Sequence, residues 1–259
     1  MRFTSRAAAA ALVALVLAPQ PAPAQSDTAA ASGLSLYAET RLVSRYLWRG
    51  YDLSGGKPAI QPYAEAWLPF GLGVNAFATT ALDSVVNLDE AQLSFLYKRE
   101  IGGGFEVQGG YLLYIMPGTE TEPSSGTDPE ATTTSGEFTV ALTRNWENGY
   151  ATLTYSRGTG SGEGNSVNFW AQRTFTWGNE RWTAEPYVQA DYLDEYDAPS
   201  GERIPLVEVG VPVYFQLGPV SLVASGHLSF VTSDFVRSAN SSSNRMLPWF
   251  TVGIVYERD

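Results

Sequence analysis

Apolar and polar residues alternate along most of this 259-residue chain, and this period of two limits the fold more than any other feature. Between positions 34 and 48 the even residues are mostly apolar, whereas the odd residues include Glu39, Arg41 and Arg45. Successive side chains of a β-strand point to opposite faces, so the pattern predicts a strand with one apolar and one charged face. Segment 220–230 has the same alternation.

The alternating segments are long enough to cross a membrane. Most run about 10 to 12 residues, the length a tilted strand needs to cross a bilayer, whereas strands of soluble sandwiches are usually about 5 to 6. We therefore predict an all-β fold, a transmembrane antiparallel up-and-down barrel of about 12 strands over residues 34–259. The segments are 34–47, 58–68, 72–82, 88–99, 105–116, 136–147, 150–157, 166–177, 182–192, 204–217, 220–231 and 247–257. Segment 88–99 also fits an amphipathic helix, and we assign it to a strand because its apolar residues alternate.

The connections between these segments alternate between long and short. The long, polar ones are 48–57, 83–87, 117–135, 158–165, 193–203 and 232–246, and the short ones are 69–71, 100–104, 148–149, 178–181 and 218–219. Transmembrane barrels have long loops outside the cell and tight turns on the periplasmic side. The long loop 117–135 is acidic and rich in proline, and the sequence assigns it no role.

Aromatic residues gather at both ends of the predicted strands. Trp67, Trp177 and Trp182 lie near short turns, and Tyr46 and Trp48 lie near a long loop. The two membrane interfaces favour aromatic side chains, so we expect one belt at each interface. The competing interpretation is that strands are rich in aromatic residues in any protein.

The N-terminus has the features of a secretory signal peptide. A short basic start precedes an apolar run at residues 7–17, which is too short to span a membrane as a helix. The run is followed by Ala22-Pro23-Ala24, a small-residue cleavage pattern. We predict that residues 1–24 are removed, that residues 25–33 form a short periplasmic segment, and that the mature protein resides in the bacterial outer membrane.

Composition excludes several classes of function. The formal net charge is −11, and it becomes −13 when residues 1–24 and their two arginines are removed, which argues against nucleic-acid binding. The chain has no cysteine and one histidine, so we expect no disulfide, no thiol catalysis, no metal site and no cofactor. No stretch after the signal has 18 consecutive apolar residues, so no helix is expected to span a membrane.

One stretch resembles a known family. The sequence SRYLWRGYDLS at residues 44–54, followed by PAIQ at residues 58–61, is similar to the opening of the TorF porin family and its Gcw_chp domain, a group of Gram-negative outer-membrane barrels. The match is carried by Tyr46, Trp48, Arg49, Gly50, Pro58, Ala59, Ile60 and Gln61. The resemblance implies an outer-membrane barrel with a porin or transporter role, and it supplies neither a substrate nor an active site.

If the apolar faces meet lipid, the charged faces line the lumen. The predicted pore-lining residues are Glu39, Arg41, Arg45, Arg49, Glu65, Glu90, Glu106, Glu185, Asp191, Glu208 and His227. Barrels of 8 strands are filled and those of 16 or more are wide channels, so about 12 strands predict a narrow lumen. Its acidic lining would favour cations. We therefore expect a porin-like channel or small-solute transporter, with outer-membrane lipids, the barrel-assembly machinery and small solutes or ions as partners.

Two other functions fit the same residues. In the first, ion pairs around Arg41 and Arg45 close the interior, and the barrel acts as a structural or adhesive scaffold through its extracellular loops. In the second, His227 and Ser229, which share a strand face, act with Glu208 in a lipid-modifying enzyme. A single histidine on a strand is more often structural, so we expect no enzymatic activity.

Cleavage after Ala24 is directly testable. N-terminal sequencing of the protein recovered from outer membranes should begin at Gln25, because the residues before it match a signal peptide. Recovery of a chain that begins at Met1 would contradict the prediction.

Overall fold

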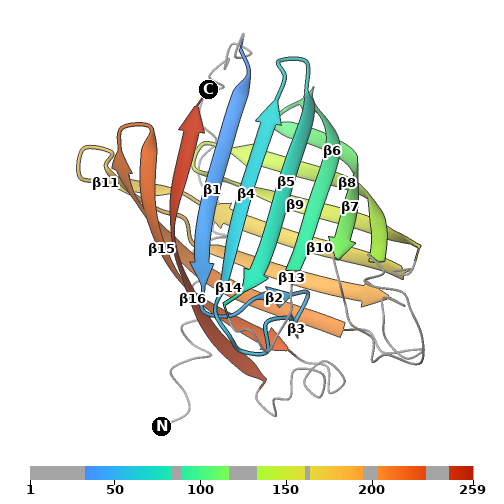
Figure 1. The fold of residues 1–259 in the computed structure, drawn as a ribbon. Helices are drawn as coiled ribbons and strands as arrows, with labels where there is room; N and C mark the ends of the chain where they lie inside the picture. Colours follow the sequence, from blue (N-terminus) through green and yellow to red (C-terminus); the bar gives the residue numbers. More distant parts are fainter. Residues whose placement is uncertain are drawn as a thin grey trace, which may run out of the picture.

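The described part of the chain forms a closed antiparallel β-barrel. The computed structural model describes residues 33–82, 89–116, 133–160, 164–194, 204–231 and 245–258, so the predicted signal peptide, almost all of segment 25–33 and most of loop 117–135 lie outside the described residues (Figure 1). The wall strands are β1 (Ser35–Val43), β4 (Ala59–Trp67), β5 (Leu72–Ala81), β6 (Asp89–Gly102), β7 (Phe105–Met116), β8 (Thr133–Trp146), β9 (Gly149–Gly160), β10 (Gly164–Arg173), β11 (Phe175–Trp177), β12 (Trp182–Ala184), β13 (Tyr187–Asp194), β14 (Ile204–Leu217), β15 (Val220–Val231) and β16 (Met246–Arg258).

Two of the predicted strands are each interrupted once. Thr174 separates β10 from β11, and Glu185 and Pro186 separate β12 from β13. Both β12 and β13 pair with β14, so each interrupted pair occupies one position in the wall. Proline has no backbone N–H to donate, which accounts for the break at Pro186. The wall therefore has 12 strands, as predicted.

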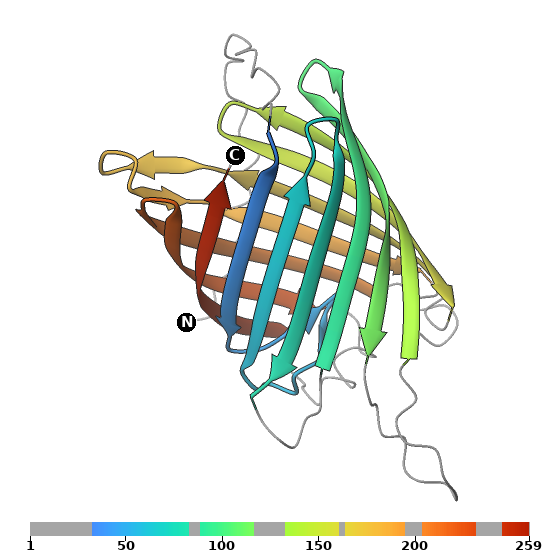
Figure 2. The same cartoon turned by 45° about the horizontal axis from the view of Figure 1, so that its top comes forward.

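The barrel closes between its first and last strands. β1 pairs with β16 from Leu36 opposite Arg258 to Val43 opposite Thr251, and its other edge pairs with β4. Figure 2 shows the strands following one another around the barrel. A closed ladder leaves no unpaired edge, which a sheet in a bilayer requires because lipid offers no hydrogen-bond partners.

The outer face of the wall is apolar. Large hydrophobic side chains on alternating positions are exposed there, including Val74, Phe95, Phe138, Val140, Leu153, Leu222, Phe250, Val252 and Ile254. Segment 88–99 belongs to this wall as strand β6, which confirms its assignment to a strand. Its alternation places Phe95 outside and Ser94 among the buried residues. The outer surface thus has the character that lipid solvates.

The short turns lie at one end of the barrel. Gly71 ends the turn between β4 and β5 with φ of 89°, a conformation that glycine adopts readily. A Cβ atom at this position would lie 2.1 Å from the backbone oxygen of Lys98. The belt predicted at this end is only partly formed, since Trp177 and Trp182 are exposed but Trp67 is buried, with the Lys98 Nζ 4.0 Å from its ring centroid.

The first strand ends earlier than the alternation predicts. β1 stops at Val43, and the backbone N–H of Ser44 still donates to Phe250 O at 2.9 Å. The chain then forms a small hairpin of β2 (Leu47–Trp48) and β3 (Tyr51–Asp52). We call residues 44–57 the mouth hairpin, because they lie at the end of β1 away from the short turns (Figure 1).

The closing register can be tested by cross-linking, since the native chain has no cysteine. Thr40 lies opposite Ile254, and residues opposite one another in an antiparallel pair have Cα atoms about 4.5 to 5.5 Å apart, which suits a disulfide. The variant Thr40→Cys/Ile254→Cys should form an intramolecular disulfide under mild oxidation, detected by mass spectrometry. Thr40→Cys/Phe250→Cys, which is four residues out of register, should not, and equal yields from the two pairs would contradict the register.

Candidate functional site

Side chains on the inner face of β1 and β4 form a connected polar cluster. Tyr37 Oη donates to Glu39 at 2.6 Å, and Arg41 donates to the same carboxylate with Nε at 2.9 Å. On β4, Tyr63 Oη donates to Glu65 at 2.5 Å. The rings of Tyr37 and Tyr63 meet edge to face with centroids 5.9 Å apart. Each carboxylate is therefore held in place by a phenol two residues before it on its own strand.

A second polar cluster joins β13, β14, β15 and β16. Tyr187 Oη donates to Glu208 at 2.5 Å and lies 2.7 Å from His227 Nδ1. Ser225 Oγ lies 2.7 Å from His227 Nε2 and also bonds Thr251 Oγ1. A phenol has one proton to give, so the histidine donates from Nδ1, and a neutral imidazole then accepts from Ser225 at Nε2. The result is a directional chain of hydrogen bonds that ends on the Glu208 carboxylate.

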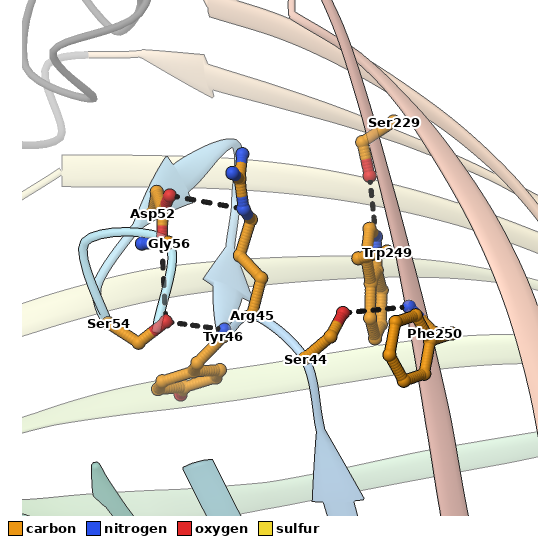
Figure 3. Close-up of polar contacts among 9 residues, drawn as sticks. All are labelled: Ser44, Arg45, Tyr46, Asp52, Ser54, Gly56, Ser229, Trp249 and Phe250. Atoms are coloured by element: carbon orange, nitrogen blue, oxygen red, sulfur yellow. Dashed lines mark hydrogen bonds and ion pairs between the residues drawn. The ribbon is translucent and has the colours of Figure 1, made fainter. Parts of the chain in front are cut away.

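This cluster differs from the predicted Ser229/His227 pair. Ser229 Oγ bonds Glu208, and Trp249 Nε1 donates to Ser229 at 3.0 Å (Figure 3). The serine that contacts His227 is Ser225, which the alternation places on the same face, also two residues away. The predicted pairing of Ser229 with His227 is therefore wrong. Both serines lie two residues from His227 on the same strand face, and the orientation of the ring selects Ser225.

The cluster is buried within the wall. The His227 ring stacks on Trp249, with centroids 3.7 Å apart and planes 10° from parallel. Gly210 makes room for the cluster, because a Cβ atom there would lie 2.5 Å from Tyr187 Cε1 and 2.6 Å from His227 Nδ1. Ser225 pairs on one side with Pro212 and on the other with Thr251, so its backbone belongs to the ladder. These contacts tie four strands together.

The mouth hairpin rests on an apolar patch inside the barrel. Leu47, Trp48 and Tyr51 pack against lumen-facing residues of β13, β14, β15 and β16, namely Leu193, Leu206, Val231 and Leu247. All four are almost fully buried. Apolar side chains that face a water-filled lumen would be unfavourable, and burial under the hairpin removes that cost. The hairpin therefore lies inside the outer mouth.

The hairpin meets the opposite wall through polar contacts. Arg49 forms a two-pronged ion pair with Glu137 on β8, with Nη1–Oε1 at 2.7 Å and Nη2–Oε2 at 2.9 Å. Tyr46 Oη donates to Glu90 on β6 at 3.3 Å. Burial raises the pKa of the Tyr46 phenol, so the group stays protonated and remains a donor. The hairpin thus contacts both sides of the barrel.

These contacts correct the expected places of Tyr46 and Trp48. The aromatic pattern predicted both residues in the outer lipid interface. Instead Tyr46 is buried against Val43 and Ala59, and the Trp48 ring meets Tyr114 of β7 edge to face with centroids 6.2 Å apart. A buried plug and a lipid interface both select aromatic side chains, so composition alone does not separate them.

The carboxylates of the lumen fall into two groups. Three pair with arginines: Glu39 with Arg41, Asp52 with Arg45 and Glu137 with Arg49. The others accept hydrogen bonds from uncharged side chains: Glu65 from Tyr63, Glu90 from Tyr46 and Gln92, Asp191 from Asn168 and Gln189, Glu185 from Thr174, and Glu208 from Tyr187 and Trp249. The second group is thus held by uncharged donors rather than by an arginine.

Most of the predicted pore-lining residues thus lie in two clusters or at the hairpin. Glu106 lies on β7 opposite Thr143 and is partly exposed. Sequence reasoning did not single out Asn168, Tyr187 or Trp249, which hold Asp191 and Glu208 in place. Their positions on the polar face of alternating strands were the available signal. Among the described residues, no group of three or more potential ligands is placed to hold a metal ion, and no helix could span a membrane.

A closed 12-stranded barrel with an apolar outer face and a polar interior is the architecture of an outer-membrane β-barrel protein. The chain belongs to the Gcw_chp family, described as a bacterial protein of unknown function, whose model matches residues 27–184. No curated protein matches the sequence.

Solved structures agree on the fold. The KdgM porin is similar over 86% of this chain and 99% of its own, with 11% identity and a TM-score of 0.55. The NanC porin is similar over 85% and 98%, with 10% identity and a TM-score of 0.54. A second KdgM structure, described as a complex with disordered oligogalacturonate, has 11% identity over 87% and 99% of the two chains and a TM-score of 0.53.

The Tyr187 hydroxyl group can be removed with little change in the volume of the side chain. Tyr187→Phe should lower barrel stability by about 1–3 kcal/mol, because Glu208 and His227 both lose a buried partner. The midpoint of heat-induced unfolding in detergent, read by gel mobility, measures this. Tyr97→Phe on the outer face of β6 is the control and should change the midpoint little, and equal midpoints for both variants would contradict a supporting role for the cluster.

Proposed function

We propose that the protein is an outer-membrane channel that passes small cations in preference to anions. The observation that carries the proposal is the second group of lumenal carboxylates, whose bonded partners are uncharged. Ionised carboxylates without a bonded cation attract cations, and field lines concentrate in a narrow passage with low-dielectric walls. The fold shared with the KdgM and NanC porins supports a channel, although it says nothing of the solute.

The charge of the lumen argues for a different solute from the one bound in a structural neighbour. One KdgM structure is described as a complex with oligogalacturonate, which is an acidic oligosaccharide. In the present chain Glu65, Asp191 and Glu208 would repel such a solute. Neutral or cationic small solutes fit this lining better.

The rival proposal is a closed scaffold that acts through its extracellular loops. It is favoured by the mouth hairpin, which fills part of the outer mouth. Ionic conductance separates the two proposals, because only a channel carries current across a planar bilayer.

Selectivity can be read from the reversal potential in a salt gradient. The purified protein should show a cation-selective reversal potential, and Glu65→Gln/Asp191→Asn should move it toward zero, because two charges that attract cations are lost. Glu180→Gln in the short turn between β11 and β12 removes the same kind of charge outside the lumen and should leave the potential unchanged. Anion selectivity of the native protein would contradict the proposed preference, and the absence of current from every variant would favour the scaffold.

A further inference from the structure

The mouth hairpin is a compact unit held by its own hydrogen bonds. Leu53 N–H donates to Tyr46 O at 2.9 Å, and Tyr46 N–H donates to Ser54 Oγ at 2.9 Å. Arg45 pairs with Asp52 at 3.3 Å across the base of the hairpin (Figure 3). These bonds lie within the hairpin and do not depend on the barrel wall. The hairpin can therefore keep its shape if it leaves the wall.

The hairpin is attached to the barrel at its two ends. Ser44 exchanges two hydrogen bonds with Phe250, from its N–H to Phe250 O at 2.9 Å and from the Phe250 N–H to its Oγ at 3.0 Å (Figure 3). At the other end Leu82 N–H donates to Pro58 O at 2.9 Å. Strand β1 ends at Val43 and strand β4 begins at Ala59, next to these two attachments. Displacement of the hairpin would therefore leave the barrel closed.

The tip of the hairpin carries a residue that its backbone disfavours. Arg49 and Gly50 occupy the two central positions of the turn with φ of 49° and 91°. Turns of this kind favour asparagine, aspartate or glycine at the first position. Arginine is disfavoured in this conformation, so contacts of its side chain must offset the free-energy cost of the backbone. The contribution is the two-pronged ion pair with Glu137, which lies 88 residues further along the chain.

The Arg49–Glu137 pair is also a charged contact between the hairpin and the wall. The Arg49 and Glu137 side chains are only 13% and 2% exposed, so water competes little for these hydrogen bonds. The guanidinium also lies over the Trp48 ring, 4.6 Å from its centroid, and Trp48 packs against the apolar patch. The Arg49 side chain thus contacts both Glu137 on the wall and Trp48, which packs on the apolar patch.

We infer that the mouth hairpin is a gate of the channel and that the Arg49–Glu137 ion pair is the latch that holds it shut. The inference rests on the proposed channel function and adds a means of regulating it. Breaking the pair removes its contribution to the closed state, so the hairpin, still held by its apolar contacts, leaves the wall more often, moving as a unit between its attachments at Ser44 and Pro58. Opening also exposes the Glu137 and Glu90 carboxylates to the passage.

Two single substitutions separate a latch from a simple charge effect in single-channel recordings. Arg49→Asn removes the guanidinium and suits the turn better, and Glu137→Gln removes the opposite charge at nearly constant volume. A latch predicts that both variants raise the ratio of open to closed time by about tenfold or more, because each breaks the same charged hydrogen bonds. If the two variants instead changed cation current in opposite directions, the pair would act only through charge and the latch would be overturned.

Matched controls test whether the hairpin itself must move. Arg157→Asn removes an exposed arginine from the outer face of β9 and should gate as the native protein does. In Arg49→Cys/Glu137→Cys the latch is absent, so the channel should be open for a larger fraction of the time than the native protein, and a bifunctional thiol cross-linker should return it to the closed state. Persistence of the open state after verified cross-linking would overturn the gate. Heat-modified gel mobility confirms that each variant is a folded barrel.

The same recordings distinguish failure of the gate from failure of the channel. Equal open times for the native protein, Arg49→Asn and Glu137→Gln would overturn the gate and leave the channel in place. No current from any folded variant, including the uncross-linked double cysteine, would overturn both.

Discussion

The antiparallel pairing of β1 with β16 is the constraint on which the rest of the structure depends. It joins residues more than 200 positions apart in sequence, and without it the sheet would have two open edges. Lipid supplies no hydrogen-bond partner for an open edge, so a sheet with an apolar outer face is stable in a bilayer only if its ladder is closed. Closure also determines the interior, because the alternate side chains of every strand then converge on one enclosed space.

That space is filled unevenly. Near β1 and β4, tyrosines orient the carboxylates of Glu39 and Glu65, and near β14 a chain of hydrogen bonds ends on Glu208. At the outer mouth the filling is mostly apolar and comes from the hairpin of residues 44–57. The interior thus combines a lining rich in carboxylates with a folded hairpin at one end.

The sequence predicts the wall well and the mouth poorly. Strand β15 occupies residues 220–231, the same range that the alternation predicts, because its pairing follows directly from the period of two. The alternation also continues through Trp48, and there it misleads. Residues 44–48 keep the period of a strand while the chain has already left the ladder, and Tyr46 and Trp48 lie inside the barrel rather than at the lipid interface.

The hydrogen-bond partners of His227 show the same limit on a smaller scale. Ser225 and Ser229 are both two residues away on the same face, so spacing favours neither, and the orientation of the ring against Trp249 decides for Ser225. Local periodicity by itself predicted the fold class and the 12 strands of the wall, because the period of two is a property of neighbouring residues. Only the tertiary structure decided that Arg49 meets Glu137 and that residues 44–57 enter the mouth. These contacts join segments that are distant in sequence, so local periodicity carries no signal for them.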